Sequence, residues 1–139
     1  MEEPFAEELL DELLSSPDPC TYISEHDISQ RSLAEYLQEL LEKKNLKRSE
    51  VVKAAGLNNT FGYQIFTGQR GATRNKILQL AFGMQLTLRE TDRLLQAAGV
   101  NELYCKDRRD AIIIFCIDKN YSLQKTDEEL YRFGEETIC

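Results

Sequence analysis

Five polar side chains between residues 59 and 67 have the chemistry to bond the edges of nucleobases. They are Asn59, Thr60, Tyr63, Gln64 and Thr67. If Ile65 points inward, helical spacing turns all five toward solvent. The amides of Asn59 and Gln64 pair a donor with an acceptor, which matches the N6 and N7 atoms of adenine. Tyr63 and Thr67 can reach phosphate oxygens or a thymine methyl. The same residues also suit helix caps or an ordinary solvated surface.

Positively charged side chains occur on both sides of this segment in the sequence. Arg48, Arg70, Arg74 and Lys76 fall at the expected starts of neighbouring helices. Together with the free backbone N–H groups of helix starts, they are candidates for phosphate contacts. Lys43, Lys44 and Lys47 equally suit the solvated end of a helix, where cations complement the helix dipole.

The net charge of −7 is unevenly distributed along the 139 residues. Residues 1–27 contain nine acidic residues and no lysine or arginine, which gives −9. Residues 28–100 contain eleven basic and six acidic residues (+5), and residues 101–139 contain six basic and nine acidic residues (−3). Only the middle part has a field that attracts a polyanion. These shifts divide the chain into an acidic N-terminal extension (1–27), a basic core (28–100) and a C-terminal part (101–139).

The residue types of enzyme active sites and metal sites are sparse. The single histidine, His26, lies in a polar segment, and the four cysteines include no CxxC pair. No nucleophile–base pair, metal template or phosphate loop is recognisable. We therefore expect no enzyme activity, no cofactor and no metal, with Cys116 as a core thiol; a redox-sensing cysteine or a metal site is the alternative. The lack of a long apolar run and of a basic leader favours a cytoplasmic location.

Helical periodicity runs through the whole chain and predicts an all-α fold. Most of the expected helices begin at a capping residue and end at or near a glycine. They cover a stripe from Phe5 to Leu14 and then residues 18–25, 32–44, 48–55, 59–66, 74–84, 87–99, 106–118 and 123–133. Asn58 or Asn59 is expected to cap the helix at 59–66, and Thr73 the helix at 74–84.

The last two pairs of helices share a pattern. A shift of 35 residues aligns "RNKILQLA" and "TLRETDRLLQAAG" with "RDAIIIFC" and "SLQKTDEELYRFG". Identities occur at Arg74/Arg109, Leu88/Leu123, Thr91/Thr126, Asp92/Asp127, Leu95/Leu130 and Gly99/Gly134. We interpret residues 101–139 as a helical hairpin that repeats 74–99 and extends one core, with chance similarity of two capped amphipathic helices as the alternative.

Residues 32–99, about half of the chain, resemble the lambda-repressor-like (Xre-type) helix-turn-helix family of bacterial and phage transcription regulators. The resemblance rests on "SLAEYLQELLEKKNLKRSEVVKAAGL", on the "TGQR" exit from the third helix and on "NKILQLAFGMQLTLRETDRLLQAAG". It implies a five-helix lambda-repressor-like DNA-binding core, to which the acidic N-terminal helix and the C-terminal helical hairpin are added.

The resemblance implies sequence-specific binding of double-stranded DNA by a transcription regulator, whose helix near 59–66 reads the major groove. The base-reading residues would be Asn59, Thr60, Tyr63, Gln64 and Thr67, and the phosphate-binding residues Arg48, Arg70, Arg74 and Lys76. Such a protein associates with the nucleoid and is expected to form a homodimer through the C-terminal hairpin. The alternative, which overall acidity favours, is a protein-interaction adaptor that retains the scaffold without binding DNA.

Two positions depart from the family's pattern. The family generally has a small residue where Val52 stands and a branched apolar residue where Gly62 stands, and the two positions face each other across the turn. We expect Gly62 to make room for Val52, so that the packed volume is conserved. The alternative is that Gly62 lets the backbone approach a ligand. Phe66, which stands where the family often has glutamate, is expected to pack in the core.

The acidic N-terminal segment allows two interpretations. Its apolar stripe can pack on the helical body and simply add to the core. Alternatively, it lies near the basic surface and competes with DNA until a protein partner removes it.

Overall fold

The computed structural model describes residues 11, 14–15 and 32–139 of the chain. The chain divides into two units, Met1–Gln30 and Arg31–Cys139. The two helices expected before residue 28 fall in the first unit and lie outside the described residues, except that Asp11, Leu14 and Ser15 are helical. The fold described below is that of residues 32–139.

Residues 32–139 form seven α-helices and no strand, which confirms the all-α class for this part of the chain. The helices are α3 (Leu33–Lys44), α4 (Arg48–Ala54), α5 (Asn59–Phe66), α6 (Arg74–Gly83), α7 (Leu88–Ala97), α8 (Arg108–Asp118) and α9 (Leu123–Arg132). Their ends lie within two residues of those expected from the sequence. None of the described helices is long and apolar enough to cross a membrane.

Side-chain caps start most of these helices. Ser32, Asn58, Thr87, Asp107 and Ser122 each accept a hydrogen bond from a backbone N–H in the first turn of α3, α5, α7, α8 and α9, respectively. Asn58, not Asn59, is therefore the cap of α5. Thr73 is the N-cap residue of α6, as expected, with the extended backbone of an N-cap, but its side chain makes no capping hydrogen bond.

Four pairs of consecutive helices are joined by the same turn, and in three of them the left-handed residue is not glycine. Asn45, Gln85 and Asn120 end α3, α6 and α8 in the left-handed conformation, with φ of 54°, 54° and 56°. The next N–H in each case bonds back to a carbonyl five residues earlier, as in Tyr121 to Cys116 at 2.9 Å. This pattern satisfies carbonyls at the end of each helix and reverses the chain. Gly56 makes the same turn between α4 and α5, where the Leu57 N–H bonds to the Val52 carbonyl at 3.1 Å. Residues 32–139 therefore contain three hairpins of contacting helices, α4–α5, α6–α7 and α8–α9, which we call the first, second and third hairpin.

The 35-residue repeat extends to the hydrogen bonds of the second and third hairpins. Arg74 donates from Nε to the Asn101 carbonyl at 2.9 Å and from NH2 to the Glu102 carbonyl at 3.0 Å. Arg109 donates from the same nitrogens to the carbonyls of Glu136 and Thr137, which are the residues 35 positions later. Asp92 and Asp127 likewise accept from the N–H groups of Leu103 and Ile138. The two hairpins therefore share side-chain chemistry as well as sequence.

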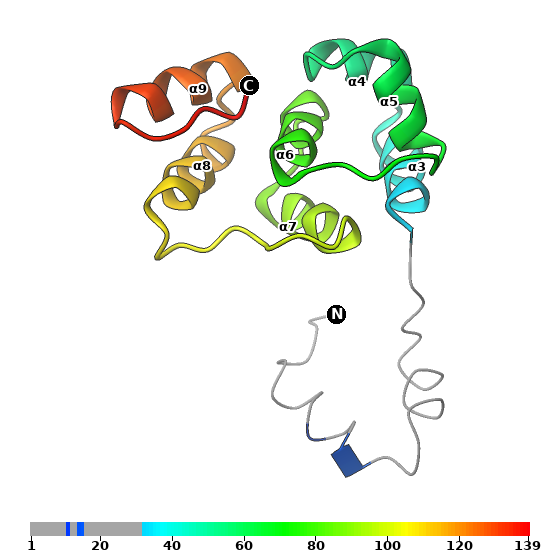
Figure 1. Cartoon of the computed structure of the whole chain (residues 1–139), viewed down its shortest axis with the longest axis horizontal. Helices are drawn as coiled ribbons and strands as arrows, with labels where there is room; N and C mark the ends of the chain where they lie inside the picture. Colours follow the sequence, from blue (N-terminus) through cyan, green and yellow to red (C-terminus); the bar gives the residue numbers. More distant parts are fainter. Residues whose placement is uncertain (1–10, 12–13, 16–31) are drawn as a thin grey trace. The chain divides into compact units, whose positions relative to one another are not determined.

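Helix α6 lies in the middle of this assembly, with α3–α5 on one side and α8 and α9 on the other in the view of Figure 1. It contacts α4, α7 and α9, while α3 contacts α5 and α7. Leu37, Ile65, Ile77, Leu78, Leu94 and Leu95 are among the fully buried side chains. Phe66, at 6% exposed, is also in this core, as expected. Helix α5 is held by its apolar side against α3 and α4.

The contact between α4 and α5 depends on the small size of Gly62. A Cβ atom built on Gly62 would lie 2.5 Å and 2.6 Å from the two γ-carbons of Val52, closer than real Cβ contacts allow. The expectation that Gly62 makes room for Val52 is confirmed. The glycine lowers the intrinsic stability of α5 by about 1 kcal/mol relative to alanine, and the close approach of the two helices offsets this cost.

We expect Gly62→Ala to lower the free energy of unfolding by about 1–2 kcal/mol, because overpacking outweighs the better helix propensity. Adding Val52→Ala should recover part of this loss, since it removes the methyls that the new Cβ meets. Urea denaturation of the two single variants and the double variant measures the coupling. Gly71→Ala is the control, because a Cβ there meets nothing within 4 Å. Strict additivity of the two substitutions would contradict the packing explanation.

Candidate nucleic-acid interface

Helix α5 has an apolar side in the core and a polar side at the surface. Gly62, Ile65 and Phe66 are buried. Of the five candidate base-reading residues, Asn59, Thr60, Tyr63 and Thr67 are exposed and Gln64 is partly exposed. Their spacing along one helix brings all five to the same side of α5. The structure therefore groups them on one accessible surface.

Local hydrogen bonds decide which donors and acceptors of these side chains are still available to a ligand. The Asn58 side chain accepts from the N–H groups of Thr60 and Phe61 at 2.9 and 3.3 Å. The cap therefore leaves the Asn59 amide unused. The Thr67 hydroxyl donates to the Tyr63 carbonyl at 2.9 Å, so its remaining capacity is that of an acceptor.

Three cations stack on the aromatic rings of α5. The guanidinium carbon of Arg48 lies 4.8 Å from the centre of the Tyr63 ring. On Phe61, the guanidinium carbon of Arg70 lies 5.0 Å and the ammonium of Lys76 5.9 Å from the ring centre. Because Phe61 and Tyr63 are two residues apart, they lie on nearly opposite sides of the helix axis. Arg48 therefore lies against the polar side itself, to which Tyr63 belongs, while Arg70 and Lys76 lie beside Phe61, and the cation–π contacts order all three.

The starts of the two helices next to α5 lack a capping side chain. Neither Lys47 at α4 nor Thr73 at α6 makes a side-chain cap hydrogen bond, whereas the caps of the other five described helices do. The first backbone N–H groups of a helix have no partner within it, and at the start of α6 no capping side chain supplies one. Such a start attracts anions, and Lys76 lies within its first turn.

A 39-residue stretch around α5 contains no acidic residue. Between Val51 and Arg89 there are five basic residues and neither aspartate nor glutamate, in a chain with 24 acidic residues. This signal is visible in the sequence, but summing charge over residues 28–100 hides it, because that sum includes acids of α3 and α7. The exposed acid next to this stretch is Glu50, which lines a shallow hollow with Lys53, Asn58 and Asn59.

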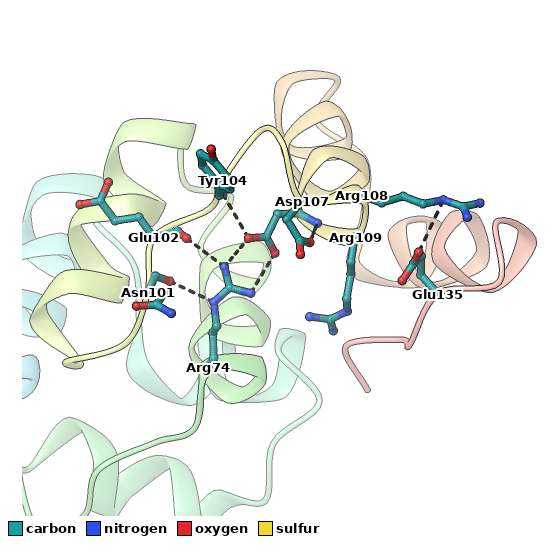
Figure 2. A pocket seen from close by; sticks show the side chains of 9 residues that line it. Arg74, Asn101, Glu102, Tyr104, Asp107, Arg108, Arg109 and Glu135 are labelled. Atoms are coloured by element: carbon teal, nitrogen blue, oxygen red, sulfur yellow. Dashed lines mark hydrogen bonds and ion pairs between the residues drawn. The ribbon is translucent and has the colours of Figure 1, made fainter.

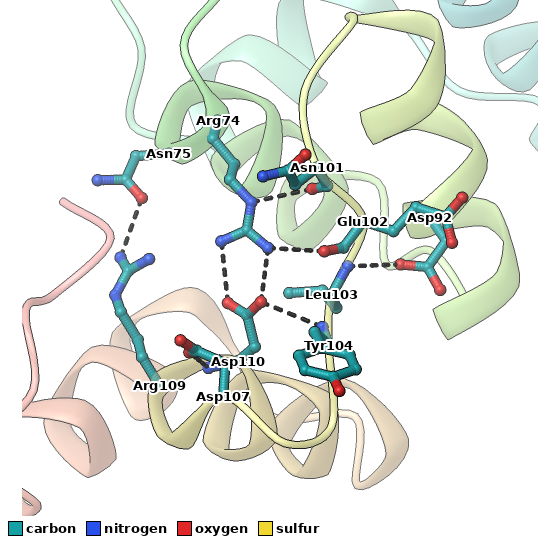
Figure 3. A network of polar contacts seen from close by, with 10 residues as sticks. All are labelled: Arg74, Asn75, Asp92, Asn101, Glu102, Leu103, Tyr104, Asp107, Arg109 and Asp110. Carbon is teal, nitrogen blue, oxygen red and sulfur yellow. Dashed lines mark hydrogen bonds and ion pairs between the residues drawn. The ribbon is translucent and has the colours of Figure 1, made fainter.

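Arg74, one of the four candidate phosphate-binding residues, is engaged elsewhere (Figure 3). Its NH1 and NH2 donate to the two carboxylate oxygens of Asp110 at 2.9 and 2.8 Å. The side chain of Asp110 is only 8% exposed and also accepts from the N–H of Tyr104. With its Nε and NH2 on the carbonyls of Asn101 and Glu102, Arg74 joins α6 to α8 and has little capacity left for a phosphate.

Lys43 and Lys44 bind Glu90 rather than lying free at the end of α3. Their ammonium groups are 3.5 and 3.1 Å from the Glu90 carboxylate. Burial raises the pKa of Glu90, but the bonds from Thr87 and the nearby Lys44 outweigh it and the pKa is lowered. Glu90 is the first acid after the acid-free stretch, and the two lysines neutralise its charge. The same ion pairs join α7 to α3.

A hollow of about 680 Å³ surrounds the Arg74–Asp110 pair (Figure 2). It is lined by Arg74, Asn101, Glu102, Tyr104, Asp107, Arg108, Arg109, Asp110 and Glu135. Several of its charged groups are already paired, including Arg108 with Glu135 at 3.5 Å. No group of three or more His, Cys, Asp or Glu within the described part of the chain is placed to hold a metal ion.

Comparison of the chain with protein-family models, with curated proteins and with solved structures gave no significant match. The interpretation of the surface around α5 therefore depends on the residues and contacts of this chain.

Removing one partner of the Arg74–Asp110 ion pair should strongly lower the free energy of unfolding. Asp110→Ala should lower the free energy of unfolding by about 3 kcal/mol, because it leaves the guanidinium of Arg74 partly buried without its counter-charge. Asp110→Asn should cost less, since an amide oxygen still accepts one of these bonds. Urea denaturation measures both, with the exposed Glu128→Ala as control. A loss for Asp110→Ala as small as that of the control would show that the pair does not join the hairpins.

Proposed function

We propose that the protein binds double-stranded DNA sequence-specifically as a transcription regulator of bacterial or phage type. In this proposal α3–α7 form the lambda-repressor-like core, α4 and α5 are the helix-turn-helix pair, and α5 enters the major groove. The observation that carries the proposal is the exposed polar side of α5, which belongs to an acid-free stretch and has Arg48, Arg70 and Lys76 beside its aromatic rings. A duplex presents phosphates on both sides of its major groove, so this arrangement of charge is complementary to it.

The chemistry of the groups on this surface indicates which of them would contact bases and which would contact phosphates. Asn59, Thr60, Tyr63, Gln64 and Thr67 would contact base edges, with Asn59 and Thr60 at the leading end of the helix, where recognition helices contact bases. Arg48, Arg70 and Lys76, together with the uncapped N–H groups of α6, would bind phosphates. Arg74 is left out of this set, because its guanidinium is bonded to Asp110.

The proposal extends to the oligomeric state and the location of the regulator. A reader of short half-sites gains affinity when two copies bind related sites, so we propose a homodimer. We also propose a cytoplasmic protein that associates with the nucleoid when bound. The overall charge of −7 opposes DNA binding at long range, so the local field of the α5 surface must dominate near the duplex.

Selection of bound duplexes from a random pool, followed by affinity measurements over a range of salt concentrations, tests the proposal on the full chain. We expect affinity to fall steeply with salt, because phosphate contacts release counterions. Gln64→Ala should relax the preference at one base pair by about 1–3 kcal/mol. Arg70→Ala should weaken binding to all sequences alike and reduce the salt slope by about 1.

Lys125→Ala provides the matched control, because Lys125 is an exposed cation on α9, outside the proposed surface. It should leave both affinity and base preference unchanged. Absence of DNA binding even at low salt would contradict the proposal and favour the adaptor class, in which the same scaffold binds a protein.

A further inference from the structure

Helix α8 carries an exposed stripe with charge at both ends and apolar groups between them. Arg108, Ala111, Phe115 and Asp118 are spaced three, four and three residues apart, so they share one side of the helix. Phe115 is 53% exposed, and Arg108 and Asp118 are also exposed. The Tyr121 ring meets Phe115 edge-on, with centroids 6.1 Å apart, and the Lys119 ammonium lies 5.6 Å from the Phe115 ring centre.

The repeat shows that the matching side of α6 is covered. Leu80 and Gly83 are the equivalents of Phe115 and Asp118 after the 35-residue shift. Leu80 is fully buried, and a Cβ on Gly83 would lie 3.0 Å from the Val51 carbonyl oxygen of α4. On α8, no helix among the described residues covers the same side to this extent. The third hairpin therefore exposes an apolar surface that the second hairpin buries.

We propose that this stripe pairs with the same stripe of a second copy of the chain, with the two α8 helices antiparallel. A two-fold axis at the level of Ile113 places Arg108 of one copy opposite Asp118 of the other, and Ala111 opposite Phe115. Each contact occurs twice, so the interface has two ion pairs at its ends and two large-on-small apolar contacts between them. This self-complementarity in charge and size is what an isologous interface requires.

Other occupants fit the stripe less well. A nucleic acid is disfavoured by the exposed Phe115 ring and the Asp118 carboxylate. An unrelated helix would need a large apolar residue and two charges of the right sign at the same spacings. The choice of a second copy also rests on the proposed function, because two related half-sites call for a two-fold dimer.

The short length of α8 limits the strength of this dimer. Eleven residues make a helix of about 16 Å, so the contact belongs to the small class of protein interfaces. We therefore expect reversible dimerisation in solution, which two linked half-sites on one duplex would reinforce by raising the effective concentration.

Sedimentation equilibrium of the full chain in reducing buffer, without DNA, tests the interface independently of the proposed function. Phe115→Asp should weaken dimerisation at least about thirtyfold, as loss of a central aromatic anchor does. Tyr131→Asp is the matched control, because Tyr131 is an 80% exposed aromatic on α9 outside the stripe, and it should leave the dimer unchanged. Circular dichroism confirms that both variants are folded.

Charge exchange tests the orientation. Asp118→Arg should weaken the dimer, because it places two like charges opposite each other at both ends. Adding Arg108→Asp should restore it, although Arg108 also donates to the Phe133 carbonyl at 2.9 Å and pairs with Glu135.

A chain that is monomeric at all concentrations, or a dimer that Phe115→Asp does not affect, would overturn this inference. Failure to restore the dimer in a folded double variant would overturn the antiparallel pairing, and none of these results bears on whether the monomer binds DNA.

Discussion

The close packing of Val52 against Gly62 is the constraint on which the surface around α5 depends. It lets α5 approach α4 so closely that any side chain at position 62 would collide with the γ-carbons of Val52. With Ile65 and Phe66 in the core and Gly62 against α4, the other side of α5 faces outward. Arg48 at the start of α4 then lies above Tyr63. A different spacing between the two helices would separate the guanidinium of Arg48 from the ring of Tyr63.

The arginines of this chain divide between two roles according to their neighbours. Arg48 and Arg70 stack on aromatic rings at the surface, where their charge remains accessible. Arg74 and Arg109 lie at equivalent positions of the repeated hairpins and bind carbonyl groups of the segments that follow α7 and α9. These two hold helical hairpins in place. The same residue type therefore contributes to the proposed interface in one setting and to the scaffold in another.

Much of the fold could be predicted from the sequence, because helix starts and ends are encoded locally. Capping residues such as Ser32, Thr87 and Ser122 and the left-handed glycines 56, 68, 99 and 134 mark the ends of the helices. The exposed positions on α5 followed from helical periodicity once Ile65 was placed in the core. The repeat was also visible, because it preserves the residues that make the shared hydrogen bonds.

The residues that sequence analysis did not place depend on contacts between distant segments. Arg74 pairs with Asp110, 36 residues later. The repeat sets Arg74 apart from Arg70, because Arg74 matches Arg109, but it does not identify the partner of Arg74. The side-chain conformation of Thr73, which leaves the α6 start uncapped, is likewise not encoded by residue type alone. The pairing of Lys43 and Lys44 with Glu90 requires α3 and α7 to be adjacent, which only the tertiary fold determines.

The most direct test of the account is a map of where a selected duplex touches the full chain, obtained from amide chemical shifts of the isotope-labelled protein. We predict that the largest shifts upon titration occur in residues 59–67, at the start of α4 and in residues 70–76, while α8 and α9 change little. Shifts concentrated on α8 and α9, with α5 unaffected, would contradict the claim that the polar side of α5 is the surface that meets DNA.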